Sequence, residues 1–272
     1  MNLAEEATNA KIEPRHICVY GAPKSGKTEL VGALAKDYKL WVLSLDGGYK
    51  TWLRKDSAAF PYLKNIEVFY LRDSQTYPIG VETCLKVVKA TPRNVDICEK
   101  HGKVACPVCT KDGSPRPVLP LADFDVKKDI LVIDNYNQLM NSVLNNMFKD
   151  ELAKDNFDFK ADWDDWRKQG SISDRFGTTI QVAPYNVIVL THEIVAEHED
   201  GGKKLSPIGG TRNKSSDFGG WFDDCVYTEL VGGEYRAYSS GEKKSRIVVG
   251  SRTGKKLQDA AGKQLGLIEL FK

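Results

Sequence analysis

One short glycine-rich stretch constrains this chain more than any other part of its sequence. Residues 15–38 read RHICVYGAPKSGKTELVGALAKDY and contain the pattern G-x-x-x-x-G-K-T at residues 21–28. The apolar run at residues 17–20 predicts a buried strand before the pattern, and a helical pattern follows it. A strand, a glycine-rich turn and a helix in this order predict a loop that binds phosphate groups.

The residue types in this loop suit the phosphates of a nucleotide. Gly21 and Gly26 let the backbone curl so that several N–H groups point at phosphate oxygens. Lys27 is placed to reach the β- and γ-phosphates, and Thr28 to offer its hydroxyl to Mg²⁺. We therefore expect ATP and Mg²⁺ as cofactors. The expected nucleotide-binding residues are Gly21, Ala22, Pro23, Lys24, Ser25, Gly26, Lys27, Thr28 and Glu29.

A second nucleotide motif lies in residues 127–144, KKDILVIDNYNQLMNSVL. Residues 130–133 form a continuous apolar run, which is typical of a buried parallel strand. Asp134 ends this run, at the edge of the sheet where ligands bind in α/β folds. We expect Asp134 to join Thr28 in holding Mg²⁺.

Hydrolysis of ATP also needs a group that orients or deprotonates the attacking water. No glutamate follows Asp134, so the candidates lie elsewhere. Asp46 ends a strand-like run and precedes two glycines, which also fits a simple turn. Glu193 lies at the end of another strand-like run, in residues 185–199. The residues themselves leave this choice open.

The order of these motifs resembles the RecA-like ATPase core, in which a polar sensor follows the strand after the magnesium aspartate. Within that group the chain is similar to small bacteriophage nucleotide-binding proteins grouped with single-strand annealing recombinases, over residues 12–255. The resemblance implies Asp46 as the catalytic carboxylate, at a place where the group usually has glutamate. It also implies Thr191 or His192 as the sensor.

These motifs predict an α/β fold of the P-loop NTPase class across residues 1–272, as a single RecA-like ATPase domain. We expect a mainly parallel sheet with helices on both faces and a C-terminal β ribbon that turns at Gly232 and Gly233. A small zinc-binding insertion is expected at residues 91–120.

The insertion is rich in Pro, Gly and charge, so it buries too little apolar surface to order itself. It contains the pattern C-x2-H-x4-C-x2-C, and bound metal contributes on the order of 10 kcal/mol of folding free energy. We predict a closed, structural zinc site, with a redox C-x-x-C pair as the alternative. Its ligands are Cys98, His101, Cys106 and Cys109. The other cysteines, Cys18, Cys84 and Cys225, are predicted core residues.

Two further regions carry charges that fit nucleic acid or nucleotide. Residues 194–220 are rich in Gly and Ser and predict a long loop; RecA-like proteins have a mobile DNA-binding loop at this position. Its basic residues, which contact either DNA or a nucleotide phosphate, are Lys203, Lys204, Arg212 and Lys214. Near the C-terminus the resemblance implies that Arg252 or Lys255 completes the ATP site of a neighbouring subunit. A basic edge that discourages strand pairing explains these two residues equally well.

Trp163 and Trp166 share one side of a predicted helix, with Phe159 adjacent, which favours core packing or a subunit contact. The net charge of +2 excludes a polycation, so any DNA site must be a local patch. No apolar run is long enough to cross a membrane, and no leader is evident, so a cytoplasmic protein is expected.

Together these observations predict a Mg²⁺-dependent ATPase that binds single-stranded DNA and promotes annealing or strand pairing in phage recombination or repair. The expected partners are single-stranded DNA, other copies of the chain with ATP at subunit interfaces, and a phage single-strand-binding protein. Two alternatives stay open: an ATP-switched adaptor or loader with little hydrolysis, and a small-molecule or nucleotide kinase.

Overall fold

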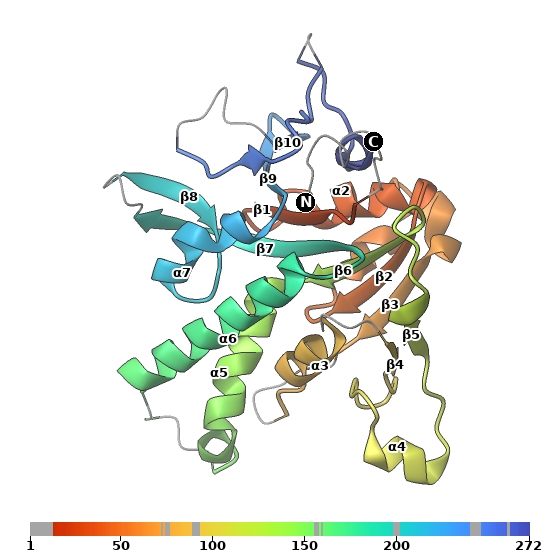
Figure 1. The fold of residues 1–272 in the computed structure, drawn as a ribbon, viewed down its shortest axis with the longest axis vertical. Coiled ribbons are helices and arrows are strands. Elements are labelled where there is room, and N and C mark those ends of the chain that lie inside the picture. Colours follow the sequence, from red (N-terminus) through yellow and green to blue (C-terminus); the bar gives the residue numbers. More distant parts are fainter. Residues whose placement is uncertain are drawn as a thin grey trace, which may run out of the picture.

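The computed structural model describes residues 13–71, 73, 77–88, 93–154, 158, 160–197, 202–239, 246–259 and 262–272. Within these residues a nine-stranded sheet has the central order β10–β9–β1–β7–β6–β2–β3, with β8 paired to β7 and β11 to β9 (Figure 1). Neighbours among β1 (His16–Gly21), β2 (Lys39–Ser44), β3 (Ile66–Tyr70), β6 (Asp129–Asp134), β7 (Asn186–Glu197) and β9 (Asp224–Val231) pair in parallel. The predicted mainly parallel sheet is thereby confirmed.

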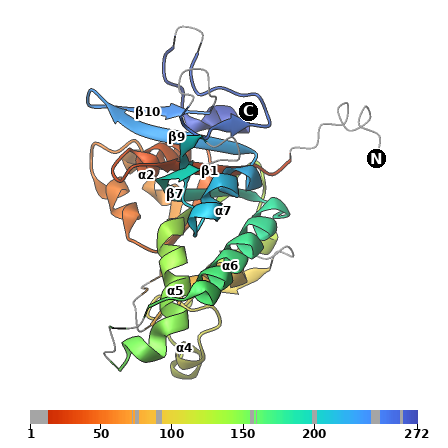
Figure 2. The same cartoon turned by 90° about the vertical axis from the view of Figure 1, so that its left-hand side faces the viewer.

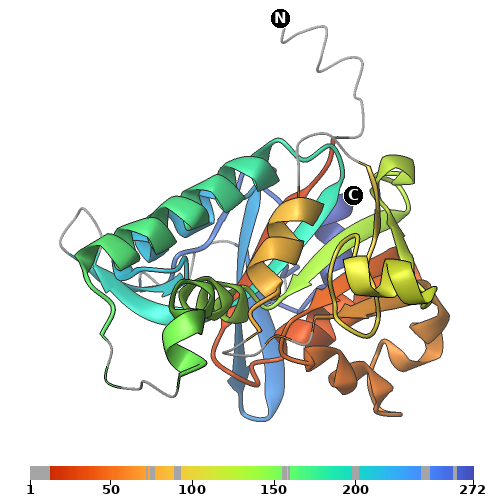
Figure 3. The same ribbon diagram turned by 90° about the horizontal axis from the view of Figure 1, so that it is seen from below.

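The continuous apolar runs become central strands because both faces of the sheet are covered. Along β1, Ile17 and Val19 pack into one core cluster, while Cys18 and Tyr20 pack into the other. On the Ile17 face lie α2 (Lys27–Gly32) and the 3₁₀ segments Ala33–Lys36, Gly48–Leu53 and Phe60–Asn65. On the Cys18 face lie α3 (Gly80–Val87), α5 (Tyr136–Leu152) and α6 (Trp163–Gln181), which stand in front of the strands in Figure 3.

Local signals decide where the two long helices begin. Asn135 caps α5, because its side chain accepts a hydrogen bond from the backbone N–H of Gln138. Asp162 and Asp165 form a capping box at the start of α6. The first of these caps fixes α5 directly behind Asp134, so the end of β6 and the start of α5 form one rigid corner.

The predicted C-terminal β ribbon consists of β9 and the antiparallel β10 (Glu234–Tyr238). Gly232 and Gly233 join them with φ angles of 61° and 85°, the positive values that a two-residue type I′ turn requires. A short strand, β11 (Gly250–Ser251), pairs with the start of β9, and the chain ends in the 3₁₀ segment Leu267–Phe271.

The insertion differs from the expectation of a loop held by metal alone. β4 (Asn94–Asp96) and β5 (Val118–Pro120) pair antiparallel, and Val95 and Leu119 reach the main core. The 3₁₀ segment Leu121–Asp123 follows β5. Only the part around α4 (Pro107–Asp112) extends away, to the end of the molecule opposite β10 (Figures 1 and 2).

Two other expectations are wrong. Residues 194–220 are not one long loop: β7 continues to Glu197, pairs antiparallel with β8 (Lys203–Pro207), and α7 (Arg212–Asp217) follows. Residues 198–201 lie outside the described residues. Trp163 and Trp166 do not pack in the core, because their exposed fractions are 80% and 42%; Phe159 lies outside the described residues.

Gly177 on α6 makes a sharp test of the packing. A Cβ atom there would lie 2.0 Å from the ring of Trp221, whereas one at Gly170 on the same helix would meet only the Lys214 side chain, at 3.6 Å. We expect Gly177→Ala to lower the free energy of unfolding by about 1–3 kcal/mol through overpacking. Gly170→Ala, the matched control, should be neutral or stabilising by up to about 1 kcal/mol through helix propensity. Denaturant unfolding of both variants measures this, and equal stability of the two would contradict the packing of α6.

Candidate nucleotide site and metal centre

The glycine-rich loop leaves the carboxyl end of β1 and runs into α2, as the sequence pattern predicts. Gly21 has a φ of 154°, and a Cβ there would lie 2.1 Å from the carbonyl oxygen of Thr228 on β9. Gly26 has a φ of 89°, and a Cβ there would lie 2.6 Å from the ring of Tyr235 on β10. Both glycines are therefore required by the backbone and by the close approach of the neighbouring strands.

Lys27 lies inside the loop, with only 7% of its surface exposed. Its Nζ donates hydrogen bonds to the carbonyl oxygens of Gly21, at 2.9 Å, and Ala22, at 2.7 Å. Burial lowers the pKa of Lys27 to about 8, while the nearby carboxylates of Asp134, Glu193 and Asp46 act in the opposite direction. A positive charge held among backbone groups at a loop of this shape fits an anionic ligand.

Asp134 ends β6 at the same edge and is 3% exposed. Burial and the negative charge of Asp46 raise the pKa of Asp134 to about 7; Lys27 and a hydrogen bond from the Thr28 hydroxyl lower it. Its Oδ2 is buried and has no hydrogen-bond partner among the described residues. A buried, unpartnered carboxylate oxygen beside a threonine hydroxyl is a donor set that suits Mg²⁺.

Asp46 follows β2 and lies beside Asp134. The side-chain amide of Asn135 donates to Asp46 Oδ2, and the backbone N–H of Gly48 donates to Oδ1 at 2.9 Å. A Cβ at Gly48 would lie 2.4 Å from Asp134 Oδ2, so glycine is the residue that lets this turn pass the two carboxylates. The turn and the acid, which the sequence leaves as alternatives, are thus the same feature.

The other candidate acid, Glu193, is not at the end of its strand and points away from the loop. His192 is the last β7 residue that pairs with β1, opposite Gly21, and Glu193 already pairs with Pro207 of β8. Neighbouring residues of a strand face opposite sides of a sheet. Glu193 contacts the hydroxyl of Tyr227, a residue of the core on the Cys18 face.

His192 and Thr191 lie where the resemblance places a γ-phosphate sensor. Burial, and then the charge of Lys27, lower the pKa of His192, and its Nδ1 is buried without a partner among the described residues. Both residues are held by Asn137 of α5: its Oδ1 accepts hydrogen bonds from Thr191 Oγ1, at 2.9 Å, and from the backbone N–H of His192, at 2.6 Å.

Arg252 does not reach the loop of its own chain. It follows β11, which pairs with the start of β9, whereas the loop lies beside Thr228, further along β9. Its guanidinium donates to the carbonyl oxygen of Gly220 at 2.9 Å and lies 3.6 Å from Asp223. A contribution of Arg252 to a neighbouring subunit stays a prediction.

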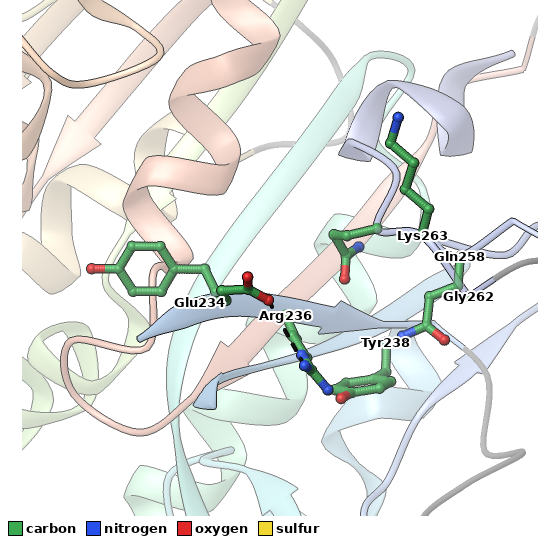
Figure 4. Close-up of a pocket in the computed structure, with 8 residues that line it drawn as sticks. Glu234, Arg236, Tyr238, Gln258, Gly262 and Lys263 are labelled. Carbon is green, nitrogen blue, oxygen red and sulfur yellow. Dashed lines mark ion pairs between the residues drawn. The ribbon is translucent and has the colours of Figure 1, made fainter. Parts of the chain in front are cut away.

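A polar pocket adjoins the loop on its β10 side and is lined by Glu234, Tyr235, Arg236, Tyr238, Gln258, Gly262, Lys263 and Gln264. Figure 4 shows Glu234 paired with Arg236 along β10, with Gln258 and Lys263 contributed by the C-terminal segment. Tyr235 belongs both to this pocket and to the wall of the loop, since its ring lies against Gly26.

The four predicted zinc ligands are brought together. The ligand atoms of Cys98, His101, Cys106 and Cys109 all lie within 4.8 Å of one another, with His101 Nδ1 3.2 Å from Cys109 Sγ. Donors on a tetrahedral zinc ion are about 3.7 Å apart, so this buried set has the size and the soft chemistry that zinc requires. Backbone N–H groups, that of Cys109 first, lower the pKa of Cys106 to about 7, which favours the thiolate. The three other cysteines are buried, as predicted.

Sequence reasoning missed several residues of the nucleotide site. Asn135, Asn137 and Gly48 adjoin predicted residues, and the Asp-Asn-Tyr-Asn run after β6 was the available signal. Tyr235 had no local signal, because the β9–β10 hairpin brings it to Gly26 from more than two hundred residues away in sequence.

A glycine-rich loop after β1, a magnesium-type aspartate after β6 and β7 inserted between these two strands define a P-loop ATPase with a RecA-like sheet. A family model described as "AAA domain" (AAA_24) matches residues 13–253, and the chain belongs to this family. The resemblance to RecA-like P-loop ATPases is thereby confirmed. No curated protein matches the chain significantly.

Two solved structures are similar to the chain. The ATPase domain of a phage helicase has 13% identity and a TM-score of 0.46, covering 97% of this chain and 96% of that one. A KaiC-like protein from the hyperthermophilic archaeon Pyrococcus horikoshii OT3 has 12% identity and a TM-score of 0.38, covering 83% of this chain and 77% of that one. Both TM-scores are below 0.5, so the family assignment stands on the match over residues 13–253. Among the described residues, no helix has the length and apolar character needed to span a bilayer.

The buried charge of Asp134 predicts a dependence of stability on pH. Its pKa in the folded chain is raised from 3.8 to about 7, so the folded state binds more protons than the unfolded state, and stability falls as the pH rises from about 4 to about 7. Without magnesium and nucleotide, we expect Asp134→Asn to be more stable than the wild type at about pH 8, by about 2 kcal/mol, with the difference vanishing toward about pH 4.

Thermal unfolding in chelator across this pH range measures the effect. Asp37→Asn, a change at an exposed aspartate, is the control and should follow the wild type. An Asp134→Asn variant that is less stable than the wild type at the alkaline end of the range would contradict the described burial.

Proposed function

We propose that the chain is a Mg²⁺-dependent ATP hydrolase in which Asp46 activates the attacking water. The observation that carries this proposal is the placement of Asp46: it lies beside the buried Asp134, and Asn135 and Gly48 fix its two oxygens. Asp46 itself is exposed, so water reaches it. A carboxylate held in one orientation next to the phosphate loop is suited to accept the proton of that water.

The described geometry favours Asp46 over Glu193 for this role. The strand alternation turns Glu193 toward Tyr227 on the other face of the sheet. Lys27 would move from the carbonyl oxygens of Gly21 and Ala22 to the β- and γ-phosphates, and His192 would donate to the γ-phosphate. Thr28 and Asp134 would hold Mg²⁺, which neutralises charge that develops on the phosphates.

We further propose that single-stranded DNA binds along β8 and α7 and that the protein promotes annealing or strand pairing in phage recombination. Lys203 and Arg212 are exposed there, and Lys214 pairs with Asp174 at 2.7 Å. These residues follow His192 directly along the chain, so a change at the γ-phosphate reaches them by a short path. In an oligomer with ATP at its subunit interfaces, Arg252 or Lys255 would serve the neighbouring site.

Asp46 is one methylene shorter than the glutamate usual at this place, and this keeps a second function open: an ATP-switched adaptor that binds nucleotide and hardly hydrolyses it. The two functions differ in turnover, not in nucleotide binding. Turnover therefore separates them.

The decisive assay is ATP hydrolysis by the wild type, Lys27→Ala and Asp46→Asn, each with and without single-stranded DNA. We expect DNA to stimulate the wild type, and both variants to lose at least about 100-fold in kcat. Glu193→Gln is the matched control and should keep most of its turnover. Loss of turnover in Glu193→Gln with retention in Asp46→Asn would overturn the assignment, and bound ATP without turnover in the wild type would support the adaptor.

We also propose that Cys98, His101, Cys106 and Cys109 hold one structural Zn²⁺, which orders the part of residues 91–120 beyond β4 and β5. The donor atoms leave no open coordination position for chemistry. Zinc would neutralise thiols that are buried within a few ångströms of one another.

We expect one zinc per purified chain by atomic absorption, and none in Cys109→Ser. The zinc-free variant should be cleaved by protease within residues 91–120 while the ATP site still binds nucleotide, since α4 lies at the far end of the molecule. Cys84→Ser, which changes a buried cysteine outside the cluster, should keep its zinc. Wild-type protein without zinc, or Cys109→Ser with it, would refute the site.

A further inference from the structure

Asn137, in the first turn of α5, bonds through its side chain to the end of β7, and its single oxygen serves two donors there. Thr191 Oγ1 donates to Asn137 Oδ1 at 2.9 Å, and the backbone N–H of His192 donates to it at 2.6 Å. Asn137 lies three residues after Asp134. One amide oxygen thus joins the corner that carries the magnesium aspartate to the strand that carries the sensor.

The connection continues from β7 to the end of β8. Thr191 is fully buried, and its hydroxyl also lies 3.0 Å from the carbonyl oxygen of Ile208. The backbone N–H of Ile208 donates to the carbonyl oxygen of His192 at 2.9 Å. Ile208 follows β8 directly, so Asn137, Thr191 and Ile208 link the nucleotide site to the β8–α7 turn. We call these three residues the Asn137 link.

A second buried connection ends at the same turn. The hydroxyl of Tyr136, the residue before Asn137, lies 2.8 Å from Ser173 Oγ on α6. Ser173 Oγ in turn donates to the carbonyl oxygen of Gly209 at 2.5 Å, and Gly209 N–H donates to Ser215 Oγ on α7 at 3.0 Å. Tyr136, Ser173 and Ser215 are all fully buried. Buried polar contacts of this kind are costly to break singly, so the parts that they join move together.

We propose that Asn137 is a positioning residue that holds His192 at the phosphate loop and transmits the nucleotide state to residues 203–215, which carry the exposed Lys203 and Arg212. This inference rests on the proposed function for the meaning of the signal, since those residues are the proposed DNA contact. Asn137 itself touches neither nucleotide nor DNA. It acts only through Thr191 and His192.

The test is amide hydrogen exchange over residues 203–215, with and without Mg²⁺ and the non-hydrolysable analogue AMPPNP. In the wild type we expect the analogue to slow exchange in this segment. In Asn137→Ala we expect the analogue to bind within roughly threefold of the wild-type affinity while the slowing is lost. Asn137→Asp should keep the slowing, because a carboxylate oxygen accepts the same two hydrogen bonds.

Two further variants separate transmission from simple loss of structure. Asn141→Ala changes an exposed asparagine one turn further along α5 and should behave as the wild type. Thr191→Val removes the hydroxyl without changing the shape of the side chain. It should reduce the slowing as Asn137→Ala does, and the double variant should lose no more than either single variant, since all three break one link.

Turnover gives a second readout, and we expect Asn137→Ala to lose about tenfold in kcat with little change in KM for ATP. Retained slowing in Asn137→Ala, or no slowing in a wild type that binds AMPPNP, would overturn the inference. A wild type that shows the slowing but does not hydrolyse ATP would instead refute the proposed hydrolysis and leave the Asn137 link standing.

Discussion

The site depends on two opposite charges that the fold buries next to each other. Lys27 and Asp134 are 7% and 3% exposed, at the ends of neighbouring parts of one sheet edge. Each charge is costly to bury alone, and each shifts the pKa of the other toward the ionised form. The rest of the site serves this pair: Gly21 and Gly48 make room for it, and Thr28 and Asp46 lie against it. Such a pair is a poor source of stability and a good place for a magnesium ion between phosphates.

The sequence predicted the parts of this arrangement that local rules govern. The glycine-rich loop, the apolar strands at 17–20 and 130–133 and the Gly232-Gly233 turn each follow from a few neighbouring residues, and the structure has all of them. Cys98, His101, Cys106 and Cys109 lie within twelve residues of one another, and they also converge. The α/β class followed directly from these pieces.

The missed parts depend on pairing between distant segments. Residues 203–207 read KKLSP, with no alternation that would predict a strand, and they become β8 only because β7 extends past β1 and offers a free edge. Glu193 reads as the end of a strand for the same reason. Tyr235 and Asn137 reach the site through a hairpin and through a helix cap, and neither contact leaves a trace in the local sequence.

The insertion is built in two parts. β4, β5 and the apolar side chains Val95 and Leu119 belong to the main core, and Thr83 of α3 donates a hydrogen bond to the carbonyl oxygen of Gly102 at 3.0 Å. The Cys and His ligands lie beyond this anchor, toward α4. Folding of the ATPase core and binding of metal are therefore separable, and α4 stands far from the phosphate loop as a surface for a partner (Figure 1).

A structure with Mg²⁺, ADP and aluminium fluoride tests the central claim most directly. We expect Lys27 Nζ to have left the carbonyl oxygens of Gly21 and Ala22 for the fluoride, and the attacking water to lie within hydrogen-bond distance of Asp46. Such a complex with the water held by Glu193, or with Lys27 still bound to the loop carbonyls, would contradict this claim.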